Sequence, residues 1–425
     1  MTRRALIAAC ALALVVAAGP ADARTGDVTG HRQSRAATAG PIPGAVRSVS
    51  AGHGHSCALL RDGAVKCWGH NDYGQLGLGD DENRGDQPGE MGADLPTVEL
   101  GTGRTATAVS AGADHTCALL DDGTVRCWGR GERLGLGLGH TQDRGDDPGE
   151  MGDALAPVDL GTGRTATRIS AGVNHTCALL DDATVKCWGD NGHGRLGLGD
   201  TATRGDQPGE MGDALPAVDL GTGRTATAVF AGGAHSCARL DDGSVKCWGS
   251  GEFGMLGLGD VGNRGDSPGE MGDQIPALDL GTGRTVTAIG HACALLDDAT
   301  VKCWGDNSAG QLGQGDEVRR GDDPGEMGDH LPTVDLGTGR TVTAISDDGY
   351  GHPCALLDDG TLRCWGPNWR GRLGLGDTDD RGDEPGEMGD QLAPVDLGDG
   401  LRAVEVDSGT EHECARLDDA TVKCW

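Results

Sequence analysis

Residues 115–129 read His115-Thr-Cys117-Ala-Leu-Leu-Asp-Asp-Gly123-Thr-Val-Arg-Cys127-Trp128-Gly129, and this stretch decides the fold because close copies of it recur along the chain. In each copy a second cysteine follows ten residues after the first, and a tryptophan comes next. Successive first cysteines lie 60, 60, 60, 56, 61 and 60 residues apart, and such a fixed period indicates a repeat architecture. The seven pairs are Cys57 and Cys67, Cys117 and Cys127, Cys177 and Cys187, Cys237 and Cys247, Cys293 and Cys303, Cys354 and Cys364, and Cys414 and Cys424.

The stretch has the pattern of a β-hairpin. Two short β-prone runs flank residues 121–123, and a three-residue loop ending in glycine suits a type I turn closed by a residue in the left-handed region. This loop places Leu119 opposite Val125 and Cys117 opposite Cys127, and opposed residues of an antiparallel pair are close enough for a disulfide. Three repeats have alanine in place of that glycine, and we expect a less favourable turn at Ala183, Ala299 and Ala420.

Each full repeat is expected to contribute four strands. In the second repeat these are residues 107–110, 115–120, 124–128 and 157–160, with a long glycine-rich connection before the fourth. Short strands at a period of about 60 residues are typical of one propeller blade per repeat. We predict an all-β fold, a seven-bladed β-propeller over residues 46–425, whose last blade is incomplete because Trp425 follows its third strand. The repeats start near residues 46, 106, 166, 226, 286, 342 and 403.

The N-terminal residues have the pattern of an export signal. Two arginines precede an apolar run over residues 5–18, and Ala21-Asp22-Ala23 suits a cleavage site, so residues 1–23 are predicted to be a signal peptide. Residues 24–45 are predicted to be a flexible linker. Removal of the signal peptide also removes Cys10 and leaves 14 cysteines, all at the ten-residue spacing. Export together with paired cysteines indicates a secreted, periplasmic or cell-surface protein with disulfide bonds.

The composition limits the partners of the protein. The formal net charge of −31 is spread over all repeats and disfavours binding to nucleic-acid phosphates, while it serves solubility. Phe and Tyr together number four, so the core must consist of aliphatic side chains, disulfides and one tryptophan per repeat. After the signal peptide, no segment is long and apolar enough to span a membrane.

The repeats resemble those of the regulator of chromosome condensation repeat family, a family of seven-bladed β-propellers. The resemblance covers residues 46–425 and rests on Ser-Ala-Gly before His-x-Cys, the Leu-x-Asp-Gly-x-Val turn, Trp-Gly, and Gly-Gln-Leu-Gly at residues 74–77 and 310–313. The paired cysteines and the repeated Arg-Gly-Asp-x-Pro-Gly-Glu-Met-Gly insert are similar to those of an exported bacterial branch. Three repeats depart from the pattern: repeat two has Leu134 for a glycine, repeat five lacks four residues before Cys293, and repeat six has an altered turn at residues 347–351.

The cysteines and the histidines before them allow two interpretations. Seven His-x-Cys sets could bind zinc, but cysteines paired across hairpins are better explained as disulfides, which leave no thiolate ligand. The histidines are then expected to make a structural hydrogen bond within their own blade; they are His55, His115, His175, His235, His291, His352 and His412. Arg-Gly-Asp occurs six times, which could indicate adhesion, but its place in a repeated insert favours a structural role.

Two groups of aromatic residues are distinguished by their spacing. One tryptophan per repeat is expected to pack between blades: Trp68, Trp128, Trp188, Trp248, Trp304, Trp365 and Trp425. Trp369 lies outside this series, beside Arg370 and Arg372, and is a candidate for contact with a partner.

The function predicted from these features is binding rather than catalysis. No catalytic, cofactor-binding or metal-binding residues are predicted, and the protein is not expected to be an enzyme. We expect an exported scaffold that binds a protein or a surface ligand. The resemblance implies two alternatives, inhibition of a secreted enzyme and guanine-nucleotide exchange on a small GTPase, and export and acidity argue against the second.

Overall fold

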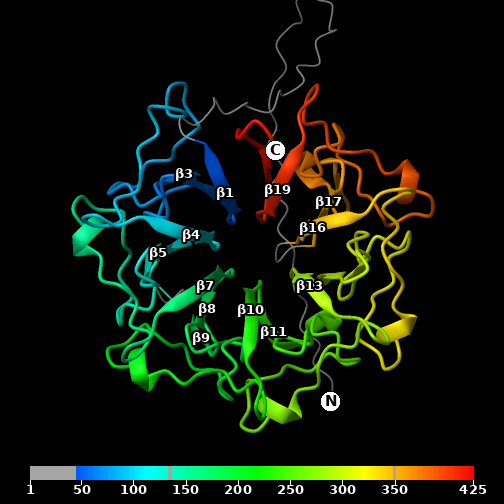
Figure 1. The fold of residues 1–425 in the computed structure, drawn as a ribbon, viewed down its shortest axis with the longest axis horizontal. Coiled ribbons are helices and arrows are strands. Elements are labelled where there is room, and N and C mark those ends of the chain that lie inside the picture. The colour runs from blue at the N-terminus through cyan, green and yellow to red at the C-terminus, as the bar shows by residue number, and fades with distance from the viewer. Residues whose placement is uncertain (1–44, 133–135, 348–350) are drawn as a thin grey trace, which may run out of the picture. The chain divides into compact units, whose positions relative to one another are not determined.

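The structure, a computed structural model, describes residues 45–132, 136–347 and 351–425. These residues form seven antiparallel three-stranded sheets, which are arranged as blades around a central axis (Figure 1). The prediction of a seven-bladed, all-β propeller is therefore confirmed. The predicted signal peptide (residues 1–23) and residues 24–44 of the predicted linker lie outside the described residues.

Each blade has an inner, a middle and an outer strand. The inner strands are β1 (Val46–Ala51), β4 (Ala106–Ala111), β7 (Ala166–Ala171), β10 (Ala226–Ala231), β13 (Val286–Ile289), β16 (Val342–Ser346) and β19 (Ala403–Ser408). The middle strands are β2 (His55–Leu60), β5 (His115–Leu120), β8 (His175–Leu180), β11 (His235–Leu240), β14 (Cys293–Leu296), β17 (Cys354–Leu357) and β20 (Glu413–Leu417). The outer strands are β3 (Val65–Gly69), β6 (Val125–Gly129), β9 (Val185–Gly189), β12 (Val245–Gly249), β15 (Val301–Cys303), β18 (Leu362–Cys364) and β21 (Val422–Cys424).

Short 3₁₀ turns lie in the connections between blades. They are η1 (Gly152–Ala154), η2 (Gly212–Ala214), η3 (Glu252–Gly254), η4 (Gly272–Gln274), η5 (Gly328–His330), η6 (Trp369–Gly371) and η7 (Gly389–Gln391). Among the residues that the structure describes, every helix is too short or too polar to span a bilayer.

The expectation of a fourth strand in each repeat is wrong. Residues 157–160 are extended, but only the Val158 N–H reaches the outer strand, where it donates to the Val125 carbonyl at 2.8 Å. Val158 and Leu160 are nevertheless buried between blades, so their apolar pattern reflects packing and not a ladder of hydrogen bonds. The seventh sheet has three strands like the others.

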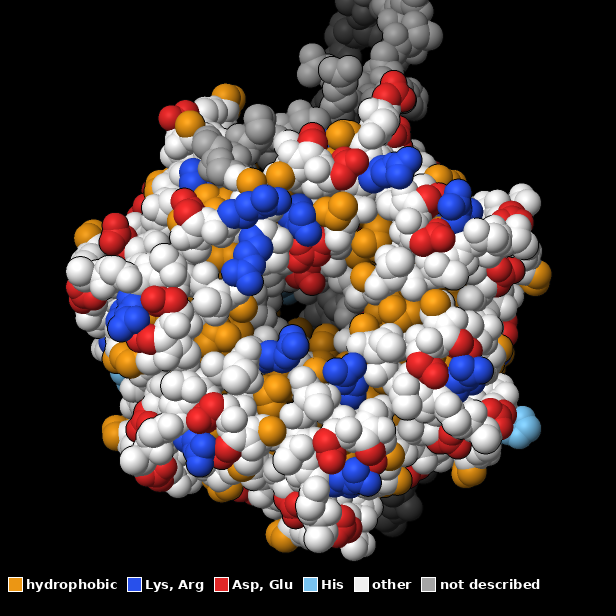
Figure 2. All heavy atoms as spheres, in the orientation of Figure 1, with side chains coloured by type: hydrophobic (Ala, Val, Ile, Leu, Met, Phe, Trp, Pro, Cys, Tyr) orange, Lys and Arg blue, Asp and Glu red, His pale blue; other side chains and the backbone are white. Residues whose placement is uncertain are grey.

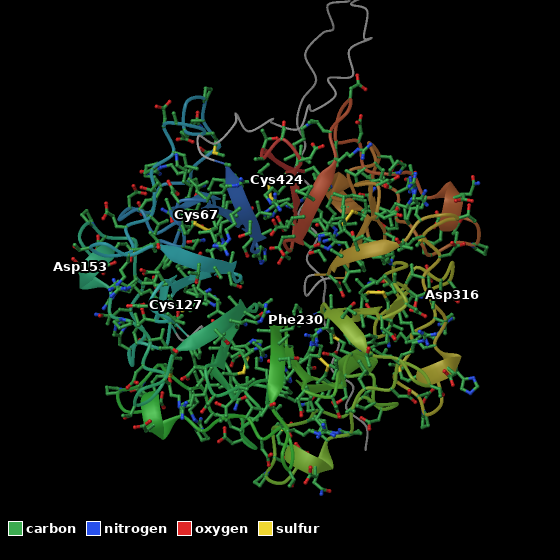
Figure 3. All side chains as sticks on the ribbon, in the orientation of Figure 1. Cys67, Cys127, Asp153, Phe230, Asp316 and Cys424 are labelled. Carbon is green, nitrogen blue, oxygen red and sulfur yellow. A yellow bond between two sulfur atoms is a disulfide. The ribbon has the colours of Figure 1, made fainter. Side chains whose placement is uncertain are left out.

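The register of the hairpins agrees with the prediction. Cys117 pairs with Cys127 and Leu119 with Val125. The sulfur atoms of all seven cysteine pairs are bonded, with S–S distances of 2.03–2.11 Å (yellow bonds in Figure 3). The residue that closes each turn has a positive φ, which is 78° for Gly123 and 64° for Ala183.

The hydrophobic core is divided among the spaces between blades. Because side chains of a strand alternate between its two faces, Cys57 and Leu59 point to one neighbouring blade and Ala58 and Leu60 to the other. Both faces of a blade are covered, and for this reason every residue of β5 is buried. Among the described residues, every space except the one between the seventh and first blades is also closed by an apolar residue of the glycine-rich connection, such as Leu76.

The ring closes where the seventh blade meets the first. Strands β19 and β20 contact β1, and the Ala51 N–H donates to the Asp407 carboxylate at 2.7 Å. The described core at this junction is smaller than the other cores and leaves Trp68 half-buried. The described residues thus complete the ring without a strand exchanged between the two ends of the chain.

Candidate functional site

The two ends of the ring differ in the turns that form them. We call the end formed by the turns between inner and middle strands, such as residues 112–114, the histidine end. We call the end formed by the turns between middle and outer strands, such as residues 121–123, the hairpin end. Figure 2 shows the hairpin end, with an opening at its centre.

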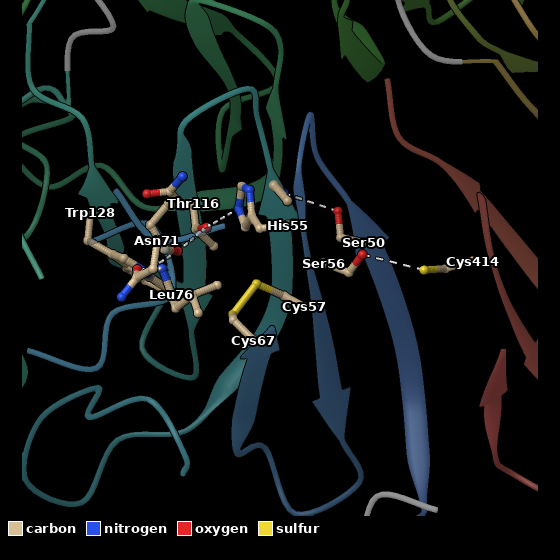
Figure 4. The surroundings of a disulfide bond; sticks show 12 residues. Ser50, His55, Ser56, Cys57, Cys67, Asn71, Leu76, Thr116, Trp128 and Cys414 are labelled. Atoms are coloured by element: carbon tan, nitrogen blue, oxygen red, sulfur yellow. Dashed lines mark hydrogen bonds between the residues drawn. A yellow bond between two sulfur atoms is a disulfide. The ribbon is translucent and has the colours of Figure 1, made fainter. Parts of the chain in front are cut away.

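The histidines before the first cysteines connect neighbouring blades. The Nε2 atom of His55 lies 2.8 Å from Thr116 Oγ1 of the next blade, and that of His115 lies 2.9 Å from Thr176 Oγ1 (Figure 4). The same contact closes the ring, since His412 Nε2 lies 2.6 Å from Ser56 Oγ. The expectation of a hydrogen bond within one blade is therefore wrong, because the partner lies in the following repeat.

The partners of the Thr116 hydroxyl identify the proton position on His55. Thr116 Oγ1 donates to the Gln75 carbonyl at 2.8 Å, so its oxygen accepts the hydrogen bond from His55 Nε2. His55 is thus a neutral imidazole protonated at Nε2. Burial is the largest cause that lowers the pKa of His55 to about 3, and burial lowers the pKa of His115 to about 4. These histidines hold the blades together as neutral donors.

The chain of contacts between histidines and hydroxyls is altered in blades four to six. Ala292 and Pro353 stand where the first four repeats have serine or threonine, and the seventh repeat has Glu413 there. His235 therefore has no hydroxyl partner, and its ring packs on that of His291 at 4.5 Å between centroids. In the next blade, His352 Nε2 lies 3.1 Å from Glu413 Oε1. The departures in repeats five and six are therefore brought together at one place in the ring.

These altered blades surround a cavity of about 250 Å³ at the histidine end. Its lining is mainly apolar and includes Phe253, Met255, Trp304, Leu312 and Pro353. The Asp347 carboxylate also faces the cavity and accepts a hydrogen bond from the Ala292 N–H at 2.7 Å. The sequence marks repeats five and six as irregular, but the cavity depends on three blades and could not be located from it.

The repeated tryptophans lie between blades. Trp128, Trp188, Trp248, Trp304 and Trp365 are fully buried, and the Trp128 indole N–H donates to the Gln75 carbonyl at 3.0 Å. Trp68 and Trp425 are partly exposed, and they lie in different cores: Trp68 in the one between the seventh and first blades, and Trp425 in the one between the sixth and seventh blades. The repeat pattern alone does not reveal that these two differ in burial from the other five.

Trp369, Arg370 and Arg372 form one cluster at the histidine end. The Trp369 side chain is 44% exposed, and the guanidinium carbons of Arg370 and Arg372 lie 4.9 Å and 4.8 Å from its ring centroid. Arg370 pairs with Glu411 at 2.8 Å, and buried Arg372 donates to the Thr410 carbonyl at 3.0 Å. The exposed ring is thus held in a fixed position by cations anchored in the next blade.

Other aromatic residues outside the tryptophan series also lie at this end. The Arg130 guanidinium covers the ring of Tyr73 at 4.7 Å, and that of Arg319 covers Phe253 at 4.4 Å. Phe230 lies near the axis, where it lines the hollow that the turns between inner and middle strands form at this end (Figure 3). Sequence reasoning missed these positions, although the chain has only two Phe and two Tyr residues and none of them recurs from repeat to repeat. The remaining one, Tyr350, lies outside the described residues.

The Arg-Gly-Asp segments are engaged in their own loops. The backbone of Arg84 forms an isolated antiparallel β-bridge with Gly69 of the outer strand, and the Arg84 guanidinium lies 2.6 Å from the Asp80 carboxylate. Glu90 Oε2 accepts the N–H groups of Gly85 and Gln87, both at 2.9 Å. Equivalent contacts recur in the other Arg-Gly-Asp repeats, except that Arg144 pairs with Glu150 because His140 stands in place of the aspartate, and they support the structural interpretation. Within the described ranges, no group of three or more His, Cys, Asp or Glu side chains could hold a metal ion.

Comparison with known proteins agrees with this fold. Residues 15–327 match the model of the RCC1-like domain, and the chain is 31% identical to the ultraviolet-B receptor UVR8 of Arabidopsis thaliana over 90% of this chain and 77% of that protein. It is also 30% identical to the human probable E3 ubiquitin-protein ligase HERC6, but spans only 30% of that longer protein. The fold matches yeast RCC1 (Prp20), solved with Kap60 bound, at a TM-score of 0.63 and 17% identity, over 86% of this chain and 78% of that one.

The architecture defines a propeller of seven repeats. The chain belongs to the RCC1-like domain family.

Proposed function

We propose that this protein is an exported binding module whose histidine end receives a protein partner. The observation that carries the proposal is that the described aromatic residues outside the tryptophan series, Tyr73, Phe230, Phe253 and Trp369, all lie at that end. Aromatic residues and arginines are enriched at protein interfaces, where rigid rings supply contact area at low entropic cost. The apolar cavity beside Phe253 offers a place for a partner side chain.

Other evidence supports binding over chemistry. The family relationship favours protein interaction, since a solved yeast relative is bound to another protein, Kap60. Inhibition of a secreted enzyme would be one form of such binding. Nucleotide exchange on a small GTPase has no specific residue in this chain to support it.

The first experiment tests whether the protein is exported and whether its cysteines form disulfides. We expect the intact mass of the mature protein to begin near Arg24, and no cysteine to react with an alkylating reagent before reduction. A chain that retains Met1 and alkylates at several cysteines would contradict export and would bring the intracellular alternatives back.

The second experiment tests the histidine end. Surface cross-linking and capture from the medium and cell envelope is expected to recover a partner with the wild-type protein and to lose it with Trp369→Ala combined with Phe253→Ala. Arg340→Ala, at the hairpin end, serves as the control because, among the residues that the structure describes, its guanidinium pairs with Asp358 and Asp359 of its own hairpin turn. Recovery that is equal for all three proteins would overturn the proposed site.

A further inference from the structure

Around the opening at the hairpin end, each blade places one pair of opposed residues, and where the middle-strand member is a leucine its side chain is buried between blades. The inner strand contributes the residue two positions after its first residue, and the middle strand contributes the residue opposite. Most pairs combine a small residue with leucine. The seven pairs are Ser48 and Leu59, Ala108 and Leu119, Arg168 and Leu179, Ala228 and Arg239, Ala288 and Leu295, Ala344 and Leu356, and Glu405 and Arg416.

Three of these pairs carry an arginine where the repeat pattern has alanine or leucine. A fourth arginine, Arg47, directly precedes Ser48 at the bulge of β1, where the other repeats have threonine or valine. Arg47, Arg168, Arg239 and Arg416, which we call the opening arginines, are therefore departures from the repeat that gather at one level of the ring.

Most of this positive charge is not neutralised by a neighbouring carboxylate. Arg47, Arg168 and Arg239 form no ion pair with any residue in the described ranges, and Arg47 and Arg168 are exposed. Arg239 donates to the Val286 and Thr287 carbonyls at 3.3 Å and 3.1 Å, which leaves its charge uncompensated. Arg416 is the exception, because its Nε lies 2.7 Å from Glu405 Oε2.

Arginines farther from the axis on the same end behave differently. Arg164 lies 3.4 Å from Asp181 and 3.0 Å from Asp182 in the hairpin turn of its blade, and Arg224 contacts Asp241 and Asp242 in the same way. Figure 2 shows this contrast: basic side chains next to acidic ones toward the periphery, and basic side chains grouped around the opening. In a chain of net charge −31, the rim of the opening is an exception to the acidic surface.

The opening arginines stand on two opposite sides of the axis. Arg47 and Arg416 belong to the adjacent blades one and seven, while Arg168 and Arg239 belong to the adjacent blades three and four (Figure 1). Positive charge on two opposite sides favours a ligand with several separated carboxylates, such as an extended acidic segment, over a single small anion. A long duplex would instead meet the aspartate turns that surround it, and its phosphates would be repelled.

We propose that the opening at the hairpin end binds an acidic peptide segment of a partner protein, one rich in Asp and Glu. Arginine forks suit carboxylates in two-point contacts, and the half-buried alanines of the inner strands, such as Ala108 and Ala228, leave room between them. This site lies at the opposite end of the ring from the proposed interface of the histidine end. Its failure would therefore leave the proposed function untouched.

The test is fluorescence anisotropy of a labelled deca-glutamate peptide with the full-length protein, over a series of salt concentrations. We expect saturable binding that weakens as salt rises, and Arg168→Ala combined with Arg239→Ala is expected to weaken it about tenfold. The matched control is Arg164→Ala with Arg224→Ala, which removes the same charge from the same two blades and is expected to change affinity less than about twofold.

Several outcomes would overturn the proposal. The first is equal weakening of deca-glutamate binding by both double variants. The second is binding of deca-lysine that is as tight as that of deca-glutamate. The others are tighter binding of a ten-nucleotide single strand, and full displacement of the peptide by an equal concentration of tripolyphosphate. Circular dichroism and the Tm of each variant report folding. If the variant in blades three and four does not fold, Arg47→Ala on the other side of the opening is expected to weaken binding about threefold.

Discussion

Burial of a histidine N–H costs free energy unless an acceptor is present, and His55 and His115 find one in the next blade. His55 and His115 are completely buried, and each gives its Nε2 proton to a hydroxyl of the next blade. A buried donor without an acceptor destabilises a protein by about 1–3 kcal/mol, so this single hydroxyl matters more than its size suggests.

Thr116→Val is expected to lower the free energy of unfolding by about 1–3 kcal/mol, because it leaves His55 Nε2 without an acceptor in a site of unchanged volume. The Gln75 carbonyl keeps its other donor, the Trp128 indole, so the loss can be assigned to the histidine. Urea unfolding measures the change. Thr116→Ser, which retains the hydroxyl as Ser56 and Ser236 do, is the control and is expected to cost less than about 1 kcal/mol. Equal losses for the two variants would contradict this assignment.

The same histidines are expected to make the protein sensitive to acid. Burial lowers the pKa of His55 to about 3 and the pKa values of His115 and His235 to about 4, so the unfolded chain takes up protons near pH 6.5 that the folded protein does not. Their contribution to stability is therefore complete above pH 6.5 and is lost as the pH falls toward 4. Each of these histidines should remove about 1.4 kcal/mol per pH unit in that window.

The measurement is the free energy of unfolding between pH 7 and 4.5 at constant ionic strength. His115→Asn should reduce the slope by about one proton, although it also lowers stability at pH 7. Carboxylates such as Asp153, whose pKa is lowered mainly by its hydrogen bond from the Thr102 hydroxyl, affect stability only below about pH 5. Because burial raises the pKa of Asp146, Asp322 and Asp383, the histidine contribution is read from the difference in slope between the wild-type protein and His115→Asn. A stability that does not change between pH 6.5 and 4.5 would contradict this reading of the histidines.

At the scale of elements, the hairpin is the unit that the sequence predicts best. Alternation of side chains and a three-residue turn determine its register, and both signals lie within 15 consecutive residues such as 115–129. The expected fourth strand failed because burial of Val158 and Leu160 produces the same apolar pattern as a ladder. The histidine contacts could not be assigned because His55 and Thr116 are 61 residues apart and meet only when the blades pack.

The hairpin turn also provides a test of backbone strain. Ala183 closes its turn at a φ of 64°, a conformation that costs a residue with a Cβ atom about 1–2 kcal/mol. Ala183→Gly is expected to stabilise the protein by about 0.5–1 kcal/mol, after the greater entropy of glycine in the unfolded chain is included.

Gly123→Ala is the reciprocal variant at the equivalent position. Its Cβ would lie 2.7 Å from the Cβ of Thr165, so we expect a loss of more than about 1 kcal/mol. Thermal unfolding of both variants, compared with the wild-type protein, measures the two effects. A destabilised Ala183→Gly protein would show that the alanine turns are not strained.

At the scale of the whole molecule, the closed ring brings together residues that differ from the repeat pattern and look unrelated in the sequence. Trp369 could be singled out because its spacing and its arginine neighbours are irregular. Phe253 and the opening arginines could not, because their significance depends on which blades are adjacent and which lie opposite. The repeat therefore predicts the scaffold, whereas the candidate surfaces become visible only after the scaffold is closed.

No disulfide of the described residues links one blade to another, and this has a consequence for a molecule that is cut at one peptide bond. Every disulfide joins residues ten positions apart in one hairpin, so none of them ties one blade to the next. A protease site inserted after Gly163, in an exposed loop where a Cβ atom would meet nothing within 4 Å, would divide the chain between the second and third blades. The cut protein should elute as one particle on size exclusion yet separate into two fragments on a denaturing gel without reductant. A single band on that gel would reveal cross-links between blades, whereas two particles on the column would show that the buried contacts between blades need a continuous chain to hold them.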